Sequence, residues 1–368
     1  MRTYQQWLER FLANDLCDFT LTDEGVQWLK LRSLERRELL AAFVAQAKID
    51  VDLKSPDRMQ TIWRTVGSDA SVLRSLDAFL MAWQRQENGR IDSKLEVIRS
   101  NLYRMTEFHW GGDFRNSLDK AIVKRFVKTD EIIPFDQLEK ITRGELREMS
   151  RGYLLNSWYN YWSAVLIENI FRRQAKVMPA PGKIKNVDFF VDGVPFDLKV
   201  TYIPREYAAC RMKELAIVDP CKCLKQFAKS HGIPFAKDGD AEQQRYEIEQ
   251  RIQDSGNVEG VEFLASIRSD WHRLIQDVKE HSRELVRWLY ENQGDMRFGA
   301  ENRIFLVLVD KDDDRASWKL KRNVDKLEPG IQNWIESFHR GDVTSIETKF
   351  SFRGRIYRTF ADVIFVLT

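Results

Sequence analysis

Apolar residues recur at helical spacing through the first third of the chain. Positions 7–12 and 39–44 carry apolar side chains three and four residues apart, which is typical of helices with one buried face. Alternating β-branched runs, the pattern of strands, are scarce in this region. The pair Asn88 and Gly89 predicts a break between two helices. We therefore predict an α-helical N-terminal domain over residues 1–135.

The pattern changes over residues 136–368. An apolar stripe predicts a long helix over about 153–174, and a short strand is expected near 175–178. Residues 205–265 are mixed and polar, which predicts a helical insertion. The remaining segments predict a helix ending near 292, a strand buried on both faces at 303–309, a helix near 318–339, and strands near 343–352 and 355–367. This alternation is typical of an α/β domain rather than a helical bundle.

Two strand-like runs, residues 187–191 and 194–200, are joined by Asp192 and Gly193. An Asp-Gly pair between two such runs is a strong signal for a β-hairpin with a two-residue turn. Such a turn fixes which residues of the two strands face each other.

In that register Asp188 lies directly opposite Asp197. Because side chains alternate along a strand, both carboxylates and the amine of Lys199 share one face. Facing like charges destabilise a strand pair, so a sequence built for stability alone avoids them. A hard divalent cation resolves the conflict, since Mg²⁺ binds carboxylate oxygens. Glu168 is a third candidate, because it interrupts a nearly apolar helical stretch.

The hairpin residues Asp188, Asp197 and Lys199, preceded by a helical glutamate, resemble the PD-(D/E)XK nuclease superfamily, also called restriction-endonuclease-like. The resemblance covers roughly residues 150–310. It implies an αβββαβ core with a mixed sheet flanked by helices. The chain departs from the family pattern at Val187, where the family has proline, and at Asp197, where glutamate is commoner.

The resemblance also implies roles for these residues. Glu168, Asp188 and Asp197 are expected to bind Mg²⁺, for which Mn²⁺ can substitute, and the carbonyl of Leu198 is a further expected ligand. Lys199 is expected to position or activate the attacking water. A metal lowers the pKa of its bound water and neutralises charge on the phosphate, which is the chemistry that phosphodiester hydrolysis requires.

These roles predict a metal-dependent endonuclease, with DNA favoured over RNA as substrate and restriction, host defence or repair as the setting. Cutting both strands of a duplex favours a homodimer. The alternative is a protein that keeps this fold, has lost catalysis, and binds nucleic acid or assists assembly. A helical interaction scaffold without any nucleic-acid role is a third alternative.

Other acid-x-Lys motifs compete with the hairpin motif. Asp50-x-Asp52-x-Lys54 also alternates acids with a lysine, but no turn or partner strand precedes it. Glu347-x-Lys349 lies on a predicted strand without a preceding hairpin acid. The hairpin itself has a simpler interpretation, a surface hairpin with a charged outer face.

Charge is unevenly distributed although the net charge is only +2. Residues 170–229 contain twelve Lys and Arg against six Asp and Glu, whereas residues 238–301 contain eight against fifteen. A basic window beside an acidic one suggests that one face meets a polyanion, although ordinary solvated faces explain it equally well. The candidates for phosphate contact are Arg172, Lys183, Lys185 and Arg287.

Cys210, Cys221, Cys223 and His231 are close enough in sequence to ligate zinc. Their Cys-x-Cys spacing is tighter than usual for zinc, so ordinary thiols are the default interpretation. A phosphate-binding loop of the GxxxxGK[ST] type is absent from the sequence, which argues against ATP-driven activity.

Composition fits a folded globular chain, with 43% apolar and 31% charged residues. Apolar stretches are strand-sized and far shorter than the ~20 residues of a membrane span. The N-terminal residues lack the apolar core of a signal peptide. We therefore expect a cytoplasmic protein that has no membrane partner.

Overall fold

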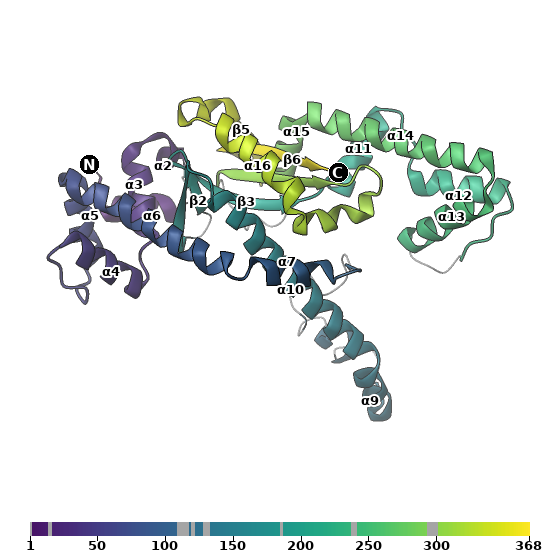
Figure 1. Cartoon of the computed structure of the whole chain (residues 1–368), viewed down its shortest axis with the longest axis horizontal. Coiled ribbons are helices and arrows are strands. Elements are labelled where there is room, and N and C mark those ends of the chain that lie inside the picture. Colours follow the sequence, from purple (N-terminus) through teal and green to yellow (C-terminus); the bar gives the residue numbers. More distant parts are fainter. Residues whose placement is uncertain are drawn as a thin grey trace.

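The chain folds around one six-stranded mixed sheet that carries helices on both faces (Figure 1). The computed structural model describes residues 2–13, 17–108, 118, 122–127, 133–184, 187–236, 241–292 and 301–368. The strands are β1 (Val177–Ile184), β2 (Val187–Val191), β3 (Val194–Thr201), β4 (Arg303–Val309), β5 (Glu347–Phe352) and β6 (Arg355–Leu367). Their order across the sheet is β1-β2-β3-β4-β6-β5. Strand β4 runs parallel to β3 and β6, and the other pairs are antiparallel, so the predicted α/β class is confirmed.

The helices occupy most of the described chain. In the first half they are α1 (Tyr4–Leu12), α2 (Cys17–Leu21), α3 (Asp23–Arg32), α4 (Arg37–Ala47), α5 (Arg58–Ser68), α6 (Ala70–Asp92), α7 (Leu95–Tyr103), the π-helix η1 (Val123–Val127), α9 (Phe135–Arg143) and α10 (Glu145–Arg172). In the second half they are α11 (Arg205–Glu214), α12 (Pro220–Ser230), α13 (Ala241–Ser255), α14 (Val258–Glu280), α15 (Ser282–Asn292), the 3₁₀ helices η2 (Asp314–Arg322) and η3 (Arg340–Ile346), and α16 (Val324–Ser337). Within the described residues, no helix combines the length and the apolar character that crossing a bilayer requires.

Strand β4 lies at the centre of the sheet, and every one of its residues is buried, as its unbroken apolar run predicts. On one face of the sheet, Ile304 and Leu306 join an apolar cluster with α10 and α16. On the other face, Phe305 and Val307 join a cluster with α11, α14 and α15. The sheet is therefore a central layer with a core on each side.

The hairpin of β2 and β3 has the predicted register, with Val191 opposite Val194. Asp192 and Gly193, the two turn residues, have φ values of 48° and 80°. Positive φ at both central positions is the geometry of the hairpin turn that matches the twist of the strands. The Asp-Gly pair therefore fixes which side chains share a face.

The N-terminal helices pack against the β1–β2 end of the sheet and share a core with it. Ile184, Val187 and Phe190 belong to the same apolar cluster as the buried side chains of α1 to α6. The backbone N–H of Gly182 donates to the carbonyl of Ser33 at 2.7 Å. A Cβ at Gly182 would lie 2.2 Å from that oxygen, so this close approach requires glycine.

Helix α6 corrects one sequence prediction. Asn88 and Gly89 lie inside this helix and do not break it. The side chain of Asn88 donates to the carbonyl of Arg172 at the end of α10, so its polar group is used in packing two helices together. Strand β1 also extends to Ile184, beyond the predicted short strand near 175–178.

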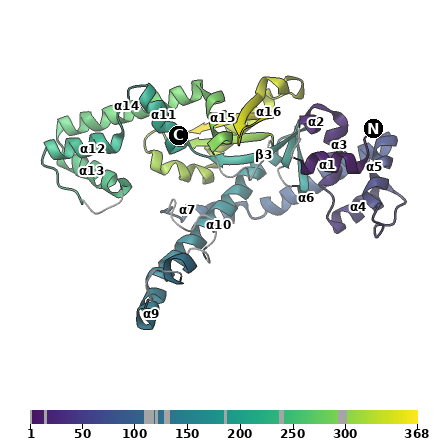
Figure 2. The same ribbon diagram turned by 180° about the vertical axis from the view of Figure 1, so that it is seen from behind.

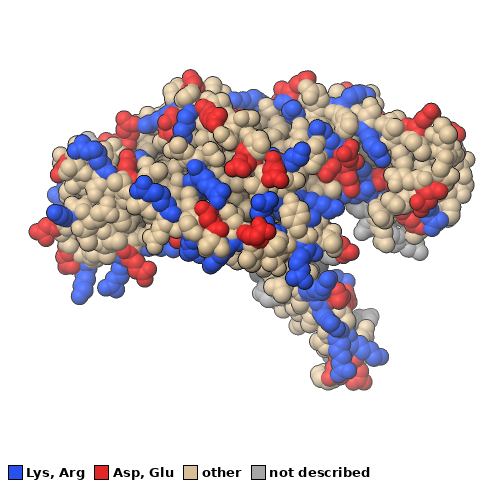
Figure 3. Space-filling model, in the orientation of Figure 1, with Lys and Arg blue, Asp and Glu red and all other residues tan. Residues whose placement is uncertain are grey.

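Two parts of the molecule project from the sheet (Figures 1 and 2). Helices α12, α13 and the first half of α14 form a lobe with its own apolar cluster, which includes Leu224, Ile248 and Leu264. Helix α9 and the first half of α10 form an arm. Because this half of α10 leaves the sheet, Leu154 and Leu155 are 67% and 37% exposed, and the predicted apolar stripe is wrong there. Lys and Arg side chains follow the arm on the side seen in Figure 3.

Candidate active site

Strand β3 changes partner at Asp197. Before this residue β3 pairs with β2, with Phe196 opposite Phe189, and from Asp197 onward it pairs with β4. Beyond this point a side chain of β2 replaces the backbone as the hydrogen-bond partner of β3. The backbone N–H of Leu198 donates to Oδ2 of Asp188 at 2.8 Å. The Asp188 carboxylate therefore lies beside β3 at the position where the hairpin ladder ends.

The sequence-predicted residues come from three elements that meet at this position. Asp188 lies on β2, Asp197 and Lys199 lie on β3, and Glu168 lies near the end of α10. The Nζ of Lys199 donates to Oδ1 of Asp197 at 2.8 Å. The Asp197 side chain is 8% exposed and that of Lys199 is 32% exposed. The partly exposed amine of Lys199 is thus hydrogen-bonded to a carboxylate that is itself buried.

The electrostatics of Asp188 show that the four groups interact. Burial, followed by the negative charge of Asp197, raises the pKa of this carboxyl to about 6. The hydrogen bond from Leu198 opposes the shift in pKa, Glu168 adds to it, and Lys199 opposes it. Three carboxylates and one amine therefore lie close enough to influence one titration.

Arg303 is a member of this site that the sequence analysis missed. It lies opposite Asp197 in the β3–β4 register, and its Nε is 3.2 Å from Oδ2 of that carboxylate. Its guanidinium also lies 4.9 Å from the centre of the Tyr290 ring, which is a cation–π contact. The available signal was the single cation at the start of an otherwise apolar buried strand.

Glu301 is a second missed residue. Its Oε2 accepts from Nη2 of Arg303 at 2.6 Å, and the residue is 1% exposed. Burial raises the pKa of this carboxyl to about 7, against the lowering effect of Arg303. Its Oε1 is buried and has no hydrogen-bond partner among the described residues. Asp197 is thus linked through Arg303 to a second buried acid.

Glu168 stands at the edge of the site and is paired with a residue predicted to contact phosphate. Its Oε2 accepts from Nη2 of Arg172 at 2.7 Å, one helical turn further along α10. Both side chains are partly exposed, at 29% and 22%. A surface pair of this kind is weak, so either group can exchange its partner for a ligand.

The other predicted phosphate contacts are less defined. Arg287 is exposed on α15. Lys183 lies on β1, where only its backbone is described, and Lys185 lies outside the described residues. These three residues are not brought into contact with the acids by any described interaction.

The rival motifs have local structural roles. Oδ1 of Asp52 accepts from the backbone N–H of Lys54 in an exposed turn. Glu347 pairs with Arg358 on the neighbouring strand, and the hydrogen bond from Arg358 lowers the pKa of this carboxyl. His231 of the candidate zinc set stacks on Phe227, and the three cysteines of that set are thiols rather than disulfides.

The donor set of the hairpin site suits a hard cation, because all three acids offer carboxylate oxygens. Burial and the neighbouring acids raise the pKa of Asp188, and a bound cation would relieve the repulsion among the three carboxylates. Over the described chain, no three His, Cys, Asp or Glu side chains stand at metal-ligand spacing. Asp197 is held instead by Lys199 and Arg303, so binding a metal would require these ion pairs to loosen.

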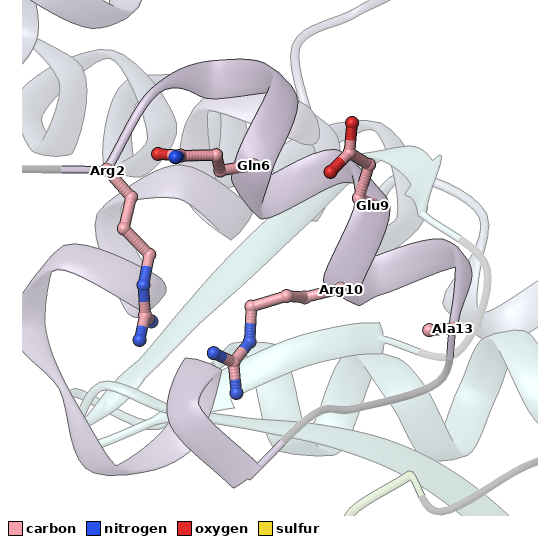
Figure 4. A pocket seen from close by; sticks show the side chains of 5 residues that line it. All are labelled: Arg2, Gln6, Glu9, Arg10 and Ala13. Carbon is pink, nitrogen blue, oxygen red and sulfur yellow. The ribbon is translucent and has the colours of Figure 1, made fainter.

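Two cavities in the described part of the chain lie away from this site. One, of about 380 Å³, lies on α1 and is lined by Arg2, Gln6, Glu9, Arg10 and Ala13 (Figure 4). Both of its arginines pair with the carboxylate of Asp18, which neutralises part of their charge. The other, of about 230 Å³, lies between α13, α14 and η2 and mixes acids with arginines. Neither includes a residue of the hairpin site.

Comparison with known proteins gives no match: no protein-family model, no curated protein and no solved structure is similar to this chain at a significant level.

Proposed function

We propose that this protein is a metal-dependent nuclease of restriction-endonuclease-like fold that hydrolyses phosphodiester bonds, with DNA favoured over RNA. The observation that carries the proposal is the arrangement of Asp188, Asp197 and Lys199 where the hairpin ladder ends, with the end of α10 bringing Glu168 close: Asp188 accepts from the N–H of Leu198, Lys199 donates to Asp197, and burial together with the charges of Asp197 and Glu168 raises the pKa of Asp188. Crowded carboxylates at a partly buried position are costly for stability, and such costs are concentrated at functional sites.

The chain order around the site supports the same function. Helix α10 leads into the antiparallel strands β1, β2 and β3, a helical crossover follows, and β4 returns parallel to β3. The resemblance to PD-(D/E)XK nucleases implies an αβββαβ order, and this chain order supports the proposal. The position of the acids and the lysine on α10 and on the β2–β3 hairpin supports it as well.

Glu168, Asp188 and Asp197 are the residues that would hold Mg²⁺ or Mn²⁺, with the Leu198 carbonyl as a further oxygen. When bound, such an ion acts as a Lewis acid on the phosphate and lowers the pKa of a water. The chain supplies the rest. Lys199 keeps a positive charge beside Asp197 and can orient a water by donating to it, since its ammonium carries three N–H donors.

Arg303 and Arg172 have supporting roles in this proposal. Arg303 fixes the orientation of the Asp197 carboxylate from the side opposite Lys199, because it holds the other oxygen. Arg172 can release Glu168 and contact a phosphate, since the pair is partly exposed.

A catalytically silent module that binds nucleic acid is the second candidate. It is favoured by the two cations on Asp197, which already neutralise that carboxylate. A silent module needs no metal at this position, whereas the nuclease does.

Cleavage assays separate the two candidates. Wild type is incubated with labelled DNA and RNA in Mg²⁺, in Mn²⁺ and in EDTA, beside Asp197→Ala and Lys199→Ala. We expect metal-dependent cleavage that falls about 100-fold or more in both variants, the usual size of a lost catalytic group. Lys54→Ala, in the rival motif, is the matched control and should cleave normally. Cleavage that is equal in wild type and both variants would remove the site assignment.

A further inference from the structure

One face of α10 continues from the candidate active site along the arm. The residues on it alternate four and three positions apart, which places them in one stripe of an α-helix. We call this stripe the α10 strip; its members are Arg147, Arg151, Leu154, Trp158, Tyr161, Val165 and Glu168. It extends over 22 residues, a length of about 32 Å at 1.5 Å per residue.

The α10 strip is exposed where a helix of this protein would ordinarily be buried. Tyr161 is 62% exposed and Leu154 is 67% exposed, and Trp158 between them is half-buried. The opposite face of α10 carries the buried side chains, among them Tyr159 and Leu166, which pack with Trp318 of η2. Trp158 packs partly against that cluster, whereas Leu154 and Tyr161 expose most of their side chains and contribute little to the core.

The outer part of the α10 strip carries two cations. Arg147 and Arg151 are exposed there; Glu148 lies beside Arg151 at the edge of the strip, and Glu145 is paired with Arg125. With respect to the residues that the structure describes, neither strip arginine is in an ion pair. Unpaired arginines beside exposed aromatic rings are the combination that binds single-stranded nucleic acid, through phosphates and base stacking.

We propose that the α10 strip binds a single-stranded segment of the nucleic-acid substrate and leads it to the candidate active site. The inference rests on the proposed function, because Glu168 ends the strip and belongs to that site. Tyr161 stacks on a base two helical turns from Glu168, about 10 Å away, and the two arginines contact phosphates further along the arm. Bases in a duplex do not present their faces, so the substrate class is DNA or RNA with a single-stranded tail, gap or flap.

A second copy of this chain is the competing occupant of the strip. The four-three spacing also occurs in coiled coils, but a coiled coil needs apolar positions sustained over three or four heptads. Here the exposed apolar part extends only from Leu154 to Tyr161, with arginines on one side of it and an acid of the candidate site beyond it. Charge and continuity with the site both favour a polyanion.

Binding is tested by fluorescence anisotropy in EDTA, where metal-dependent cleavage does not occur. The probes are a labelled single strand, its blunt duplex, and the duplex with a single-stranded tail. We expect the single strand and the tailed duplex to bind more tightly than the blunt duplex. Tyr161→Ala should weaken binding to both about tenfold, whereas Tyr161→Phe, which keeps the ring, should bind as wild type. Arg147→Ala/Arg151→Ala should lower the slope of log K against log salt by about 1.4 for the single strand.

Matched controls make the same changes away from the strip. Tyr246→Ala removes an exposed ring from the lobe, and Arg36→Ala/Arg37→Ala removes two exposed arginines from the N-terminal helices; both should leave binding unchanged. Equal binding by wild type and the strip variants would overturn the inference. A change of molecular mass in solution caused by Leu154→Ala, with DNA binding unchanged, would assign the strip to a second copy instead.

The test separates this inference from the proposed function. If the wild type cleaves no substrate but the strip variants lose binding, the nuclease proposal fails and the strip stands. If the wild type cleaves blunt duplexes as fast as tailed ones and the strip variants cleave normally, the strip fails and the nuclease proposal stands.

Discussion

Two buried arginines of this protein each pair with more than one carboxylate, Arg211 with three and Arg303 with two, yet the acids beside them shift in pKa in opposite directions. Arg211 donates two hydrogen bonds of 2.7 Å to the carboxylate of Asp277, and these hold the pKa of that carboxyl below its usual range. Arg303 is divided between Asp197 and Glu301, and burial raises the pKa of Glu301 to about 7. The other two partners of Arg211, Glu214 and Glu284, are largely exposed, whereas both partners of Arg303 are buried. An arginine therefore lowers the pKa of its buried acid at one place and does not offset the burial of a second acid at the other.

The difference separates an ion pair built for stability from a cluster that opposes it. Arg211 faces only one buried carboxylate, that of Asp277, and binds it in a bidentate geometry. At the hairpin site, burial and the negative charges of Asp197 and Glu168 raise the pKa of Asp188 to about 6. An excess of buried acid is a cost that the fold sustains, and a cation-binding function is the simplest physical reason for it.

Replacing Arg211 should produce the largest loss of stability. Arg211→Ala leaves the Asp277 carboxylate buried without its partner, so we expect the free energy of unfolding to fall by about 3 kcal/mol. Urea unfolding at pH 7 measures it. Arg273→Ala, which breaks an exposed pair with Asp270, is the matched control and should cost less than about 0.5 kcal/mol. Equal losses in the two variants would contradict the view of Arg211 as a buried structural pair.

Added metal should affect the hairpin site and leave the Arg211 pair unaffected. Mg²⁺ at a hundred times its Kd would raise the free energy of unfolding by about 2.7 kcal/mol, provided that only the folded state binds it. Thermal unfolding at pH 8 in Mg²⁺ and in EDTA measures this shift without any cleavage assay. The shift should disappear in Asp197→Asn and persist in Arg211→Ala. A shift of equal size in Asp197→Asn would mean that the ion binds elsewhere.

The hairpin is the part of the site that the sequence predicts best. Asp192 and Gly193 fix a two-residue turn, and strand alternation then determines the face of every following residue. The amino-acid sequence alone therefore relates Asp188, Asp197 and Lys199 to one another. The sequence also predicts that Glu168 lies on a helix and stands out there, because its neighbours are apolar. These inferences use local geometry only.

Arg303 and Glu301 could not be found in this way. They meet Asp197 only because β4 returns beside β3 after about a hundred residues, and the pairing of Asp197 with Arg303 depends on the parallel register of those strands. Local patterns carry no information on such a register. The exposed half of α10 was mispredicted for the same reason, since the spacing of Leu154 and Leu155 does not reveal where the sheet ends.

The smallest expected effect is the pH dependence of the stability that Asp188 contributes. Its sign distinguishes the hairpin site from the Arg211–Asp277 pair. Burial and the neighbouring acids raise the pKa of this carboxyl in the folded protein from 3.8 to about 6, so the folded state binds the proton more tightly than the unfolded state. The resulting stabilisation is complete below about pH 4 and is lost as the pH rises through 6. Asp188→Asn removes the titration while keeping an oxygen that can accept from Leu198. Between pH 4 and pH 8 we therefore expect the stability of the variant, measured relative to wild type, to rise by about 2 kcal/mol.

Urea unfolding of both proteins across that range measures the gain, and the comparison cancels the titration of Glu301, which has the same sign and is common to both. Asp192→Asn, in the exposed turn of the same hairpin, makes the same chemical change outside the acid cluster and should follow the wild-type profile. The stability of Asp277→Asn should change with pH in the opposite direction to that of Asp188→Asn, because the hydrogen bond from Arg211 lowers the pKa of Asp277. This variant should lose most stability above the usual pKa of an aspartate and least in acid. If Asp188→Asn instead lost stability as the pH rose, the carboxylate would be stabilised by its surroundings as Asp277 is, and the hairpin would be a paired surface with no need of a cation.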